Sequence, residues 1–420
     1  MQATIKTRRL SLLLLVLSSA NQAAFAQDWA QWRGPQRDGI VTTFKSPKEW
    51  PDTLKLKWKV PVGTGHSSPV LVGNRVYLLA RQDEQEVIAS YDLKSGKQVW
   101  RHSYAADYVV HEAATVYGKD PRATPLVHNG RVYTLGVSGR ITCLEARTGK
   151  LLWKKESSAN GPQGYPLFGF APSPLFVDGL VIIATGGDRQ SGMSAFNAET
   201  GEEKWKWIGE YHTPHDGVGY SSPVLMKNDG ETHLVVMIDT GLFALAPQTG
   251  QVLWKSTLAH PYECVPTPVI HNKQIIVSES KAGLIAVRLN KRGNEWEATQ
   301  VWQNQEFFNY MSSPVAQGSL LFGMSRRNKG QYFCVDLLTG QSLWRTEGRQ
   351  GESAAVLRSG NELFIQTVDG ELIVARTSRE KFDVVKRYKI ADSATWAHPA
   401  LFDRHLLVKD ANSLLLWSLS

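Results

Sequence analysis

Cysteine is scarce in this sequence, and no two cysteines are adjacent. The three that are present, Cys143, Cys264 and Cys334, are widely spaced, so disulfides are not the framework of the fold and apolar burial must hold it together. Cys143 and Cys334 stand in apolar segments ahead of glycine turns. This setting favours core thiols over nucleophiles.

Long apolar runs are also missing. The apolar run at 10–17 is far shorter than the roughly 20 residues that span a bilayer. It follows three basic residues and precedes a small-residue site ending at Ala26, which is the pattern of a cleaved signal peptide over 1–26. No cysteine follows the run that could carry a lipid. We therefore expect a periplasmic or secreted protein that does not span the membrane.

Blocks of like charge are absent as well. The 47 basic and 39 acidic residues give a formal net charge of +8, and the two kinds are interspersed along the chain. This mixture is typical of a solvated surface and gives no basis for a nucleic-acid groove or a polybasic membrane contact. We expect no nucleic-acid partner.

What the sequence does contain is an internal repeat with a period of about 45 residues, within the range of propeller blades. Each copy opens with two small or hydroxylated residues, a proline and an apolar residue. The copies begin at Ser67, Ala123, Pro172, Ser221, Pro266 and Ser312, with divergent copies at Ser353 and Ala397. Because a proline at the first residue of a strand costs no ladder hydrogen bond, these prolines mark the start of eight innermost strands.

Each repeat continues with an apolar run and then a strand, a glycine turn and a tryptophan. Glycine and tryptophan stand four apart in five copies, ending at Trp100, Trp153, Trp205, Trp254 and Trp344. Glycine allows the positive φ that a tight hairpin needs. Each unit therefore predicts four antiparallel strands, and the whole predicts an all-β, eight-bladed β-propeller.

The segment 91–100 and its copies resemble the tryptophan docking motif of propellers built from pyrroloquinoline-quinone-like (PQQ-like), or quinoprotein-type, repeats. The resemblance implies that these tryptophans wedge between neighbouring blades. The expected docking residues are Trp58, Trp100, Trp153, Trp205, Trp254, Trp302 and Trp344. Blade 5 departs from the motif with a longer arm from Gly293 to Trp302, and blade 7 lacks the Gly and Trp altogether, so we expect irregular interfaces there.

The eighth repeat ends before it can supply an outer strand. Residues 54–60 alternate apolar and basic side chains and include Trp58, so we predict that this segment closes the ring by pairing with the last blade. Residues 27–53, rich in tryptophan, proline and glycine, are expected to form a cap on the propeller of residues 54–420. The stretch 32–39 is similar to the opening of many exported bacterial PQQ-like repeat proteins.

Two functions follow from the resemblance. Quinoprotein dehydrogenases bind PQQ with calcium and oxidise an alcohol or a sugar, commonly with a disulfide between adjacent cysteines beside the cofactor. This sequence lacks such a pair and any Cys-x-x-Cys-His haem site. The lipoprotein propeller of the outer-membrane barrel-assembly machinery is similar in repeat type and length, but it carries a lipid-bearing cysteine that is missing here. We favour a non-catalytic binding or scaffold module of the cell envelope, without a cofactor, over the dehydrogenase.

Other chemical signals are weaker. His212, His215 and Asp216 could ligate a metal, but no further ligand is apparent from spacing, which favours a turn-stabilising cluster. The run 186–188 follows a strand without a helix after it, which argues against a phosphate loop.

The expected binding site is the mouth of the central channel. Pseudosymmetry brings together the residues three positions before each repeat proline or its equivalent: His66, Arg122, Ala171, Tyr220, Val265, Met311, Glu352 and Trp396. This position differs in every blade and mixes charged, aromatic and apolar groups, as a binding site does, although space-filling loop residues are the alternative. Arg122 could pair with Glu352 or present its guanidinium to an acidic ligand group. We expect a monomer that binds another envelope protein or a small ligand here.

Overall fold

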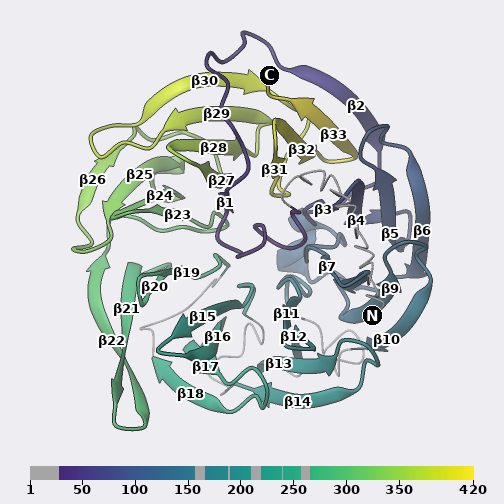
Figure 1. The fold of residues 1–420 in the computed structure, drawn as a ribbon, viewed down its shortest axis with the longest axis horizontal. Coiled ribbons are helices and arrows are strands. Elements are labelled where there is room, and N and C mark those ends of the chain that lie inside the picture. Colours follow the sequence, from purple (N-terminus) through teal and green to yellow (C-terminus); the bar gives the residue numbers. More distant parts are fainter. Residues whose placement is uncertain (1–27, 157–165, 188–189, 210–218, 239, 257–264) are drawn as a thin grey trace, which may run out of the picture.

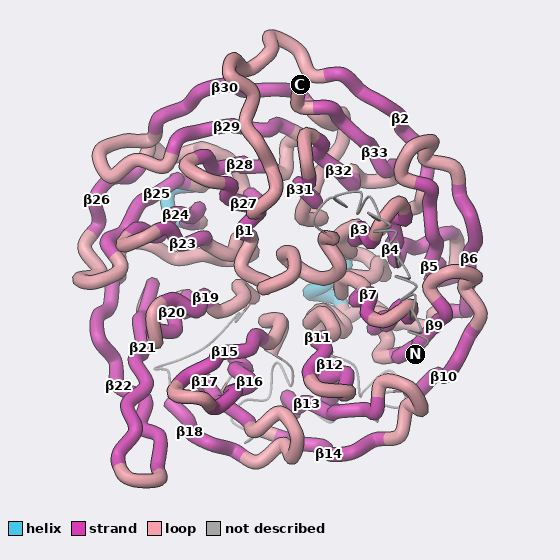
Figure 2. Tube along the Cα trace, in the orientation of Figure 1, coloured by secondary structure: helices cyan, strands magenta, loops and turns pink. Residues whose placement is uncertain are grey.

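The computed structural model describes residues 28–156, 166–187, 190–209, 219–238, 240–256 and 265–420. The predicted signal peptide and Cys264 lie outside these ranges. The described chain forms a ring of eight β-sheets, or blades, around a central axis (Figures 1 and 2). This confirms the predicted all-β, eight-bladed propeller.

The blades follow one another along the chain, each numbered here from its innermost strand outward. Blades 1 to 4 comprise β3 (Val70–Val72), β4 (Arg75–Gln82), β5 (Gln85–Asp92) and β6 (Gln98–Ala105); β7 (Leu126–His128), β8 (Arg131–Leu135), β9 (Arg140–Glu145) and β10 (Leu151–Glu156); β11 (Leu175–Val177), β12 (Leu180–Gly187), β13 (Gln190–Asn197) and β14 (Glu203–Ile208); and β15 (Val224–Asn228), β16 (Glu231–Ile238), β17 (Gly241–Leu245) and β18 (Val252–Ser256).

Blades 5 to 8 comprise β19 (Val269–His271), β20 (Gln274–Glu279), β21 (Gly283–Arg292) and β22 (Glu295–Asn304); β23 (Val315–Gln317), β24 (Leu320–Ser325), β25 (Gln331–Asp336) and β26 (Ser342–Arg345); β27 (Ala354–Ser359), β28 (Glu362–Thr367), β29 (Glu371–Arg376) and β30 (Asp383–Lys389); and β31 (Ala400–Phe402), β32 (His405–Lys409), β33 (Ser413–Ser418) and β2 (Lys55–Pro61). Two short 3-10 helices, η1 (Glu112–Tyr117) and η2 (Arg327–Lys329), lie in connections between strands.

Because all strands within a blade are antiparallel, the ring has two distinct faces. We call the side on which the innermost strands begin the strand-start face; it also bears the connections from second to third strands. The opposite side, with the turns that join first to second strands, is the turn face. No helix among the described residues is long and apolar enough to cross a membrane.

The ring closes through its N-terminal strand, as predicted. Strand β2 pairs antiparallel with β33 over the whole of its length, from Lys55 opposite Ser418 to Pro61 opposite Ser413. The last blade therefore combines three C-terminal strands with one strand from the start of the propeller. This arrangement leaves β33 with a hydrogen-bonded neighbour on each side and no open edge.

Tryptophans of the outer strands dock onto glycines of the following blade. The indole of Trp100 donates a hydrogen bond to the Ala146 carbonyl at 3.0 Å, and a Cβ on Gly149 would stand 2.4 Å from its ring. The same pairing of indole and glycine joins Trp58 to Gly96, Trp153 to Gly201, Trp205 to Gly250 and Trp302 to Gly340. Only glycine fits here, because the position combines positive φ with ring contact.

Blade 5 breaks this pattern for a visible reason. Its strands β21 and β22 form a long hairpin that projects from the ring (Figure 1), and the turn glycine, Gly293, has no atom within 4 Å of a Cβ position. Trp254 of blade 4 therefore donates instead to Nδ1 of His233 in its own blade at 3.0 Å. Trp296 on the long hairpin packs edge-on against the same imidazole, with centroids 4.7 Å apart.

Blade 7, which lacks the docking motif, recruits residues from before the propeller. Strand β1 (Ile40–Val41) adds to β27 in parallel, giving a five-stranded sheet. Phe44 packs edge-on against Phe364 with centroids 4.9 Å apart, and Trp50 lies next to Phe364 and Tyr388. The segment before the propeller thus packs a phenylalanine and a tryptophan against the aromatic residues of this blade, which lacks the motif tryptophan.

A belt of hydroxyl groups joins neighbouring innermost strands around the axis. The amide of the residue before the repeat proline donates to the hydroxyl at the same position of the next blade. These bonds run from Ser68 to Thr124, Thr124 to Ser173, Ser173 to Ser222 and Thr267 to Ser313, and from His398 of blade 8 to Ser68 of blade 1. The recurring hydroxylated residues therefore satisfy buried backbone donors between blades.

Candidate functional site

The segment before the propeller crosses the middle of the ring on the turn face (Figure 1). Trp29 exchanges backbone hydrogen bonds with Leu71 of blade 1, and the Ala30 carbonyl accepts from Val127 of blade 2. On the far side, the Gly39 carbonyl accepts from Arg358 of blade 7. Residues 28–41 are therefore bonded to innermost strands on opposite sides of the axis; we call them the plug.

Two fully buried arginines anchor the plug. Arg33 donates to the carbonyl oxygens of Ser313 and Pro314 in blade 6 at 2.9 and 2.8 Å. Arg37 donates to those of Ser173 and Pro174 in blade 3 at 3.0 and 2.8 Å. Burial lowers the pKa of Arg33 to about 10 and that of Arg37 to about 9, so both are cations at neutral pH. Carbonyl dipoles stabilise both charges, and the Asp38 carboxylate adds a favourable Coulombic interaction with Arg33.

Trp32 extends the plug toward blades 5 and 8. Its indole donates to the Thr267 hydroxyl at 2.8 Å, and its ring lies 4.4 Å from the imidazole of His398. Desolvation, with a smaller contribution from Arg33, lowers the pKa of His398 to about 3. The axis thus contains an indole, a neutral imidazole and two guanidinium groups, all contributed or contacted by the plug.

The predicted mouth residues lie in the connections that lead into the innermost strands, on the strand-start face. His66 is next to Trp396, with ring centroids 6.1 Å apart. Burial first, and then the charge of Arg122, lowers the pKa of His66 to about 4. His66 and Arg122 thus interact, as do Arg122 and Tyr220, whose hydroxyl is among the groups acting on the pKa of that guanidinium.

The Arg122 side chain is held by backbone carbonyl oxygens of its own connection. Its guanidinium donates to the carbonyl oxygens of Asp120, Tyr117 and Gly118 at 3.0, 3.2 and 3.3 Å, which holds η1 against its own loop. Among the described contacts it does not pair with Glu352. The repeat pattern could not predict this, because η1 lies in a connection whose sequence is not part of the repeat motif.

Tyr220 belongs to an aromatic group beside Arg122. The Phe168 amide donates to its hydroxyl at 3.3 Å, and the two rings meet edge-on with centroids 5.6 Å apart. Tyr117 of η1 meets Phe168 in the same way at 5.5 Å. Flat apolar surface is therefore assembled from three separate connections of the strand-start face. Ala171 and Val265 occupy the equivalent positions of blades 3 and 5 and are partly exposed.

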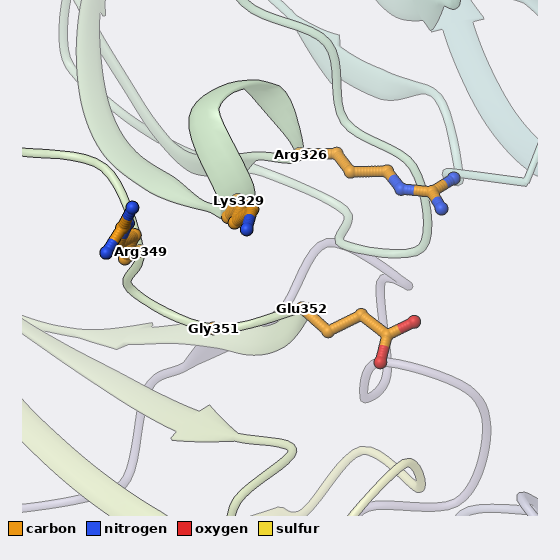
Figure 3. Close-up of a pocket in the computed structure, with 5 residues that line it drawn as sticks. All are labelled: Arg326, Lys329, Arg349, Gly351 and Glu352. Atoms are coloured by element: carbon orange, nitrogen blue, oxygen red, sulfur yellow. The ribbon is translucent and has the colours of Figure 1, made fainter.

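Glu352 lines a recess with basic walls, separate from the group around His66. The recess has a volume of about 590 Å³ and is lined by Arg326, Lys329, Arg349, Gly351 and Glu352 (Figure 3). Met311, the mouth residue of blade 6, follows Tyr310, whose ring lies 4.0 Å beneath the Arg326 guanidinium. We call this recess the basic cleft. Sequence reasoning missed it, although the run 326–329 already concentrates three basic residues.

Side chains that could hold a metal ion do not gather in the described residues. Among them, no three His, Cys, Asp or Glu side chains converge on one point; the predicted cluster of His212, His215 and Asp216 lies outside the described residues. Cys143 and Cys334 are buried in blades 2 and 6, and desolvation raises their pKa values to about 11 and about 12. Neither thiol is a reactive thiolate at neutral pH.

A protein-family model described as "Outer membrane protein assembly factor BamB" matches residues 84–346. The chain belongs to this family. The outer membrane protein assembly factor BamB of Burkholderia pseudomallei is 26% identical over 359 residues, which cover 84% of each chain. The crystal structure of BamB from Moraxella catarrhalis superposes with a TM-score of 0.64 at 14% identity, over 87% of this chain and 98% of that one.

Quinoprotein enzymes are also similar. The quinohemoprotein alcohol dehydrogenase ADH-IIG of Pseudomonas putida is 26% identical over 175 residues, 40% of this chain. That match spans only 23% of the length of the enzyme. A europium-containing methanol dehydrogenase has a TM-score of 0.56 at 12% identity, covering 94% of this chain and 98% of that one. The likeness to solved structures establishes the shared fold of PQQ-like repeats, not a shared activity.

Proposed function

We propose that the protein is an exported, non-catalytic scaffold of the cell envelope that binds a partner protein at the strand-start face. The observation that carries this proposal is the plug. Its buried arginines bind carbonyl oxygens on opposite sides of the axis, so the chain itself crosses the axis on the turn face. A partner that approaches the axis would therefore contact the varied mouth residues of the strand-start face.

The composition of that surface supports protein binding over small-molecule catalysis. Aromatic residues from several connections, including Trp396, Tyr220 and Phe168, lie beside charged groups. Aromatic anchors with a polar rim are typical of protein interfaces. The match to an outer membrane protein assembly factor over 84% of both chains also supports a role in protein binding. We propose a periplasmic location after cleavage of residues 1–26.

The second candidate function is that of a PQQ-dependent dehydrogenase oxidising an alcohol or a sugar. The similarity to ADH-IIG favours it, but the described residues offer no calcium ligand set. We therefore rank it below the scaffold.

Two parallel measurements on the full mature chain separate these functions. Tagged protein is incubated with envelope extract under mild cross-linking, and captured proteins are compared with those captured by an unrelated tagged periplasmic protein. The same preparation is mixed with PQQ and calcium and assayed for dye reduction with alcohols and sugars. A specific captured protein without dye reduction supports the scaffold. Dye reduction without specific capture would replace it with the dehydrogenase.

A further inference from the structure

The basic cleft is a preformed cavity between two loops of the strand-start face. One is the connection from β24 to β25, which contains η2; the other leads from β26 into β27. The Arg349 amide donates to the Asn328 carbonyl at 2.9 Å, and the Gln350 amide to the Gly330 carbonyl at 3.1 Å. A Cβ on Gly330 would stand 2.2 Å from the Gly351 carbonyl oxygen. The two loops are therefore locked together at backbone level.

The backbone around the cleft is held in unusual conformations. Asn328, Lys329 and Arg349 have φ values of 53°, 62° and 67°, in the left-handed region that non-glycine residues rarely occupy. Left-handed backbone at these three residues, two of them charged, costs free energy, and such outliers concentrate at binding sites. Here it directs basic side chains to the rim of the recess (Figure 3).

The charges in the cleft lack partners, whereas neighbouring cations have them. Arg345 of blade 6 pairs with Glu306, Arg379 with Asp336, and Arg387 with Glu371. Within the described part of the chain, no ion pair involves Arg326, Lys329 or Arg349, and all three are exposed. Arg326 instead lies over the Tyr310 ring, which fixes its guanidinium without neutralising it. Three cations around one recess create a positive potential that an anionic ligand would relieve.

Glu352 restricts which anion the cleft accepts. Its side chain extends to the same side as that of Arg326 (Figure 3). A carboxylate there repels a uniformly anionic polymer or a lipid headgroup layer, but it accepts hydrogen bonds from backbone N–H groups. A polypeptide supplies both complements: carboxylates for the cations and amides for Glu352. A volume of about 590 Å³ suits a few side chains of such a segment.

We propose that the basic cleft binds an acidic segment of the partner polypeptide. This inference rests on the proposed function and deepens it, because it assigns the chemistry of one part of the partner. The segment carries at least two Asp or Glu side chains, which pair with Arg326, Lys329 and Arg349, while its backbone donates to Glu352.

The test uses a fluorescein-labelled peptide of alternating Glu and Gly, with a Gln-for-Glu peptide as its neutral counterpart, and measures fluorescence anisotropy with the full mature protein. The cleft variant carries Arg326→Gln, Lys329→Gln and Arg349→Gln. The matched control carries Lys94→Gln, Arg147→Gln and Lys150→Gln, three exposed cations of the turn face. Both variants lose the same formal charge, so a general electrostatic effect moves both equally. Melting temperatures verify that each is folded.

We expect the Glu peptide to bind the wild type and the control alike, the cleft variant at least tenfold more weakly, and the Gln peptide to bind none of them. Equal binding by the cleft and control variants overturns the proposal, as does competition by inorganic polyphosphate that equals competition by unlabelled Glu peptide. If peptide binding fails while envelope extract still yields a specific partner, the cleft assignment is wrong and the scaffold function stands. If neither peptide binding nor capture of a specific partner is observed, the scaffold function is wrong as well.

Discussion

The Arg37 guanidinium donates a hydrogen bond of 2.8 Å to the carbonyl oxygen of Pro174, so a residue ahead of the first blade is bonded to the start of the innermost strand of the third. Both groups are buried. The carbonyl immediately precedes strand β11. The propeller and the segment before it are therefore one folding unit at this point.

Replacing Arg37 by Ala should lower the free energy of unfolding by about 2–4 kcal/mol, because buried carbonyl oxygens lose a charged donor. Chemical denaturation measures this loss. Arg147→Ala, which removes an exposed arginine of the turn face, should change it by less than about 0.5 kcal/mol. Similar small effects of both substitutions would mean that the plug does not stabilise the ring.

The docking of tryptophan on glycine can be separated from backbone strain by two glycines with nearly the same conformation. Gly149 has φ 74° and lies against Trp100, while Gly130 has φ 72° and nothing within 4 Å of its Cβ position. Alanine at Gly130 should cost about 1 kcal/mol from strain alone. Alanine at Gly149 should cost about 2–3 kcal/mol more, as expected for overpacking. Equal losses in thermal or chemical denaturation would refute tryptophan docking as a source of stability.

Stability should fall between neutral and mildly acidic pH because of two histidines, the buried His398 and the partly buried His66. Burial lowers the pKa of His398 to about 3 and that of His66 to about 4, whereas an unfolded histidine titrates near 6.5. Between pH 6.5 and about 4 the unfolded chain binds protons that the folded protein does not, so the stability present above pH 6.5 is lost as pH falls. Each histidine contributes a slope of up to about 1.4 kcal/mol per pH unit.

The double variant His66→Asn/His398→Asn isolates this effect from that of the carboxylates. Its free energy of unfolding should depend less steeply on pH than that of the wild type between pH 6.5 and 4. Denaturant titrations at half-unit steps give both curves. Parallel curves would show that these histidines are protonated as readily in the folded protein as in the unfolded chain.

Addition of PQQ and calcium should leave the melting temperature unchanged. A ligand at 100 times its dissociation constant stabilises a fold by about 2.7 kcal/mol, which a thermal scan detects. A quinoprotein alcohol dehydrogenase freed of its cofactor is the positive control. A calcium-dependent rise in the melting temperature of this protein would favour the dehydrogenase.

The propeller ring could be predicted almost completely from the sequence, because each blade is encoded by a short repeat of neighbouring residues. The prolines, hydroxyl pairs and Gly–Trp spacings recur in register, and the lone Trp58 segment matched the strand missing from blade 8. The site was less predictable. Arg33 and Arg37 bind carbonyl oxygens more than 130 positions away in the sequence. Because every residue has a backbone carbonyl, these acceptors cannot be predicted from residue types. The basic cleft likewise depends on how two loops of neighbouring blades meet, which the repeat does not encode.

The role of Arg122 illustrates the same limit. Its place in the repeat correctly identified a residue of the strand-start face, but its guanidinium is occupied by carbonyl oxygens of a loop whose sequence is not part of the repeat motif. Pseudosymmetry fixes where a residue stands; it does not fix what the residue bonds to.

Binding of the partner at the strand-start face can be measured by capture with a variant of the mouth residues. The variant Met311→Ala/Glu352→Ala/Trp396→Ala leaves Arg122 and its loop intact. The control Glu199→Ala/Val252→Ala/Leu338→Ala changes exposed residues of the turn face and outer wall. With both variants folded, we expect capture of the envelope partner to fall at least tenfold for the mouth variant and to stay unchanged for the control. Undiminished capture by the mouth variant would show that the partner binds another surface.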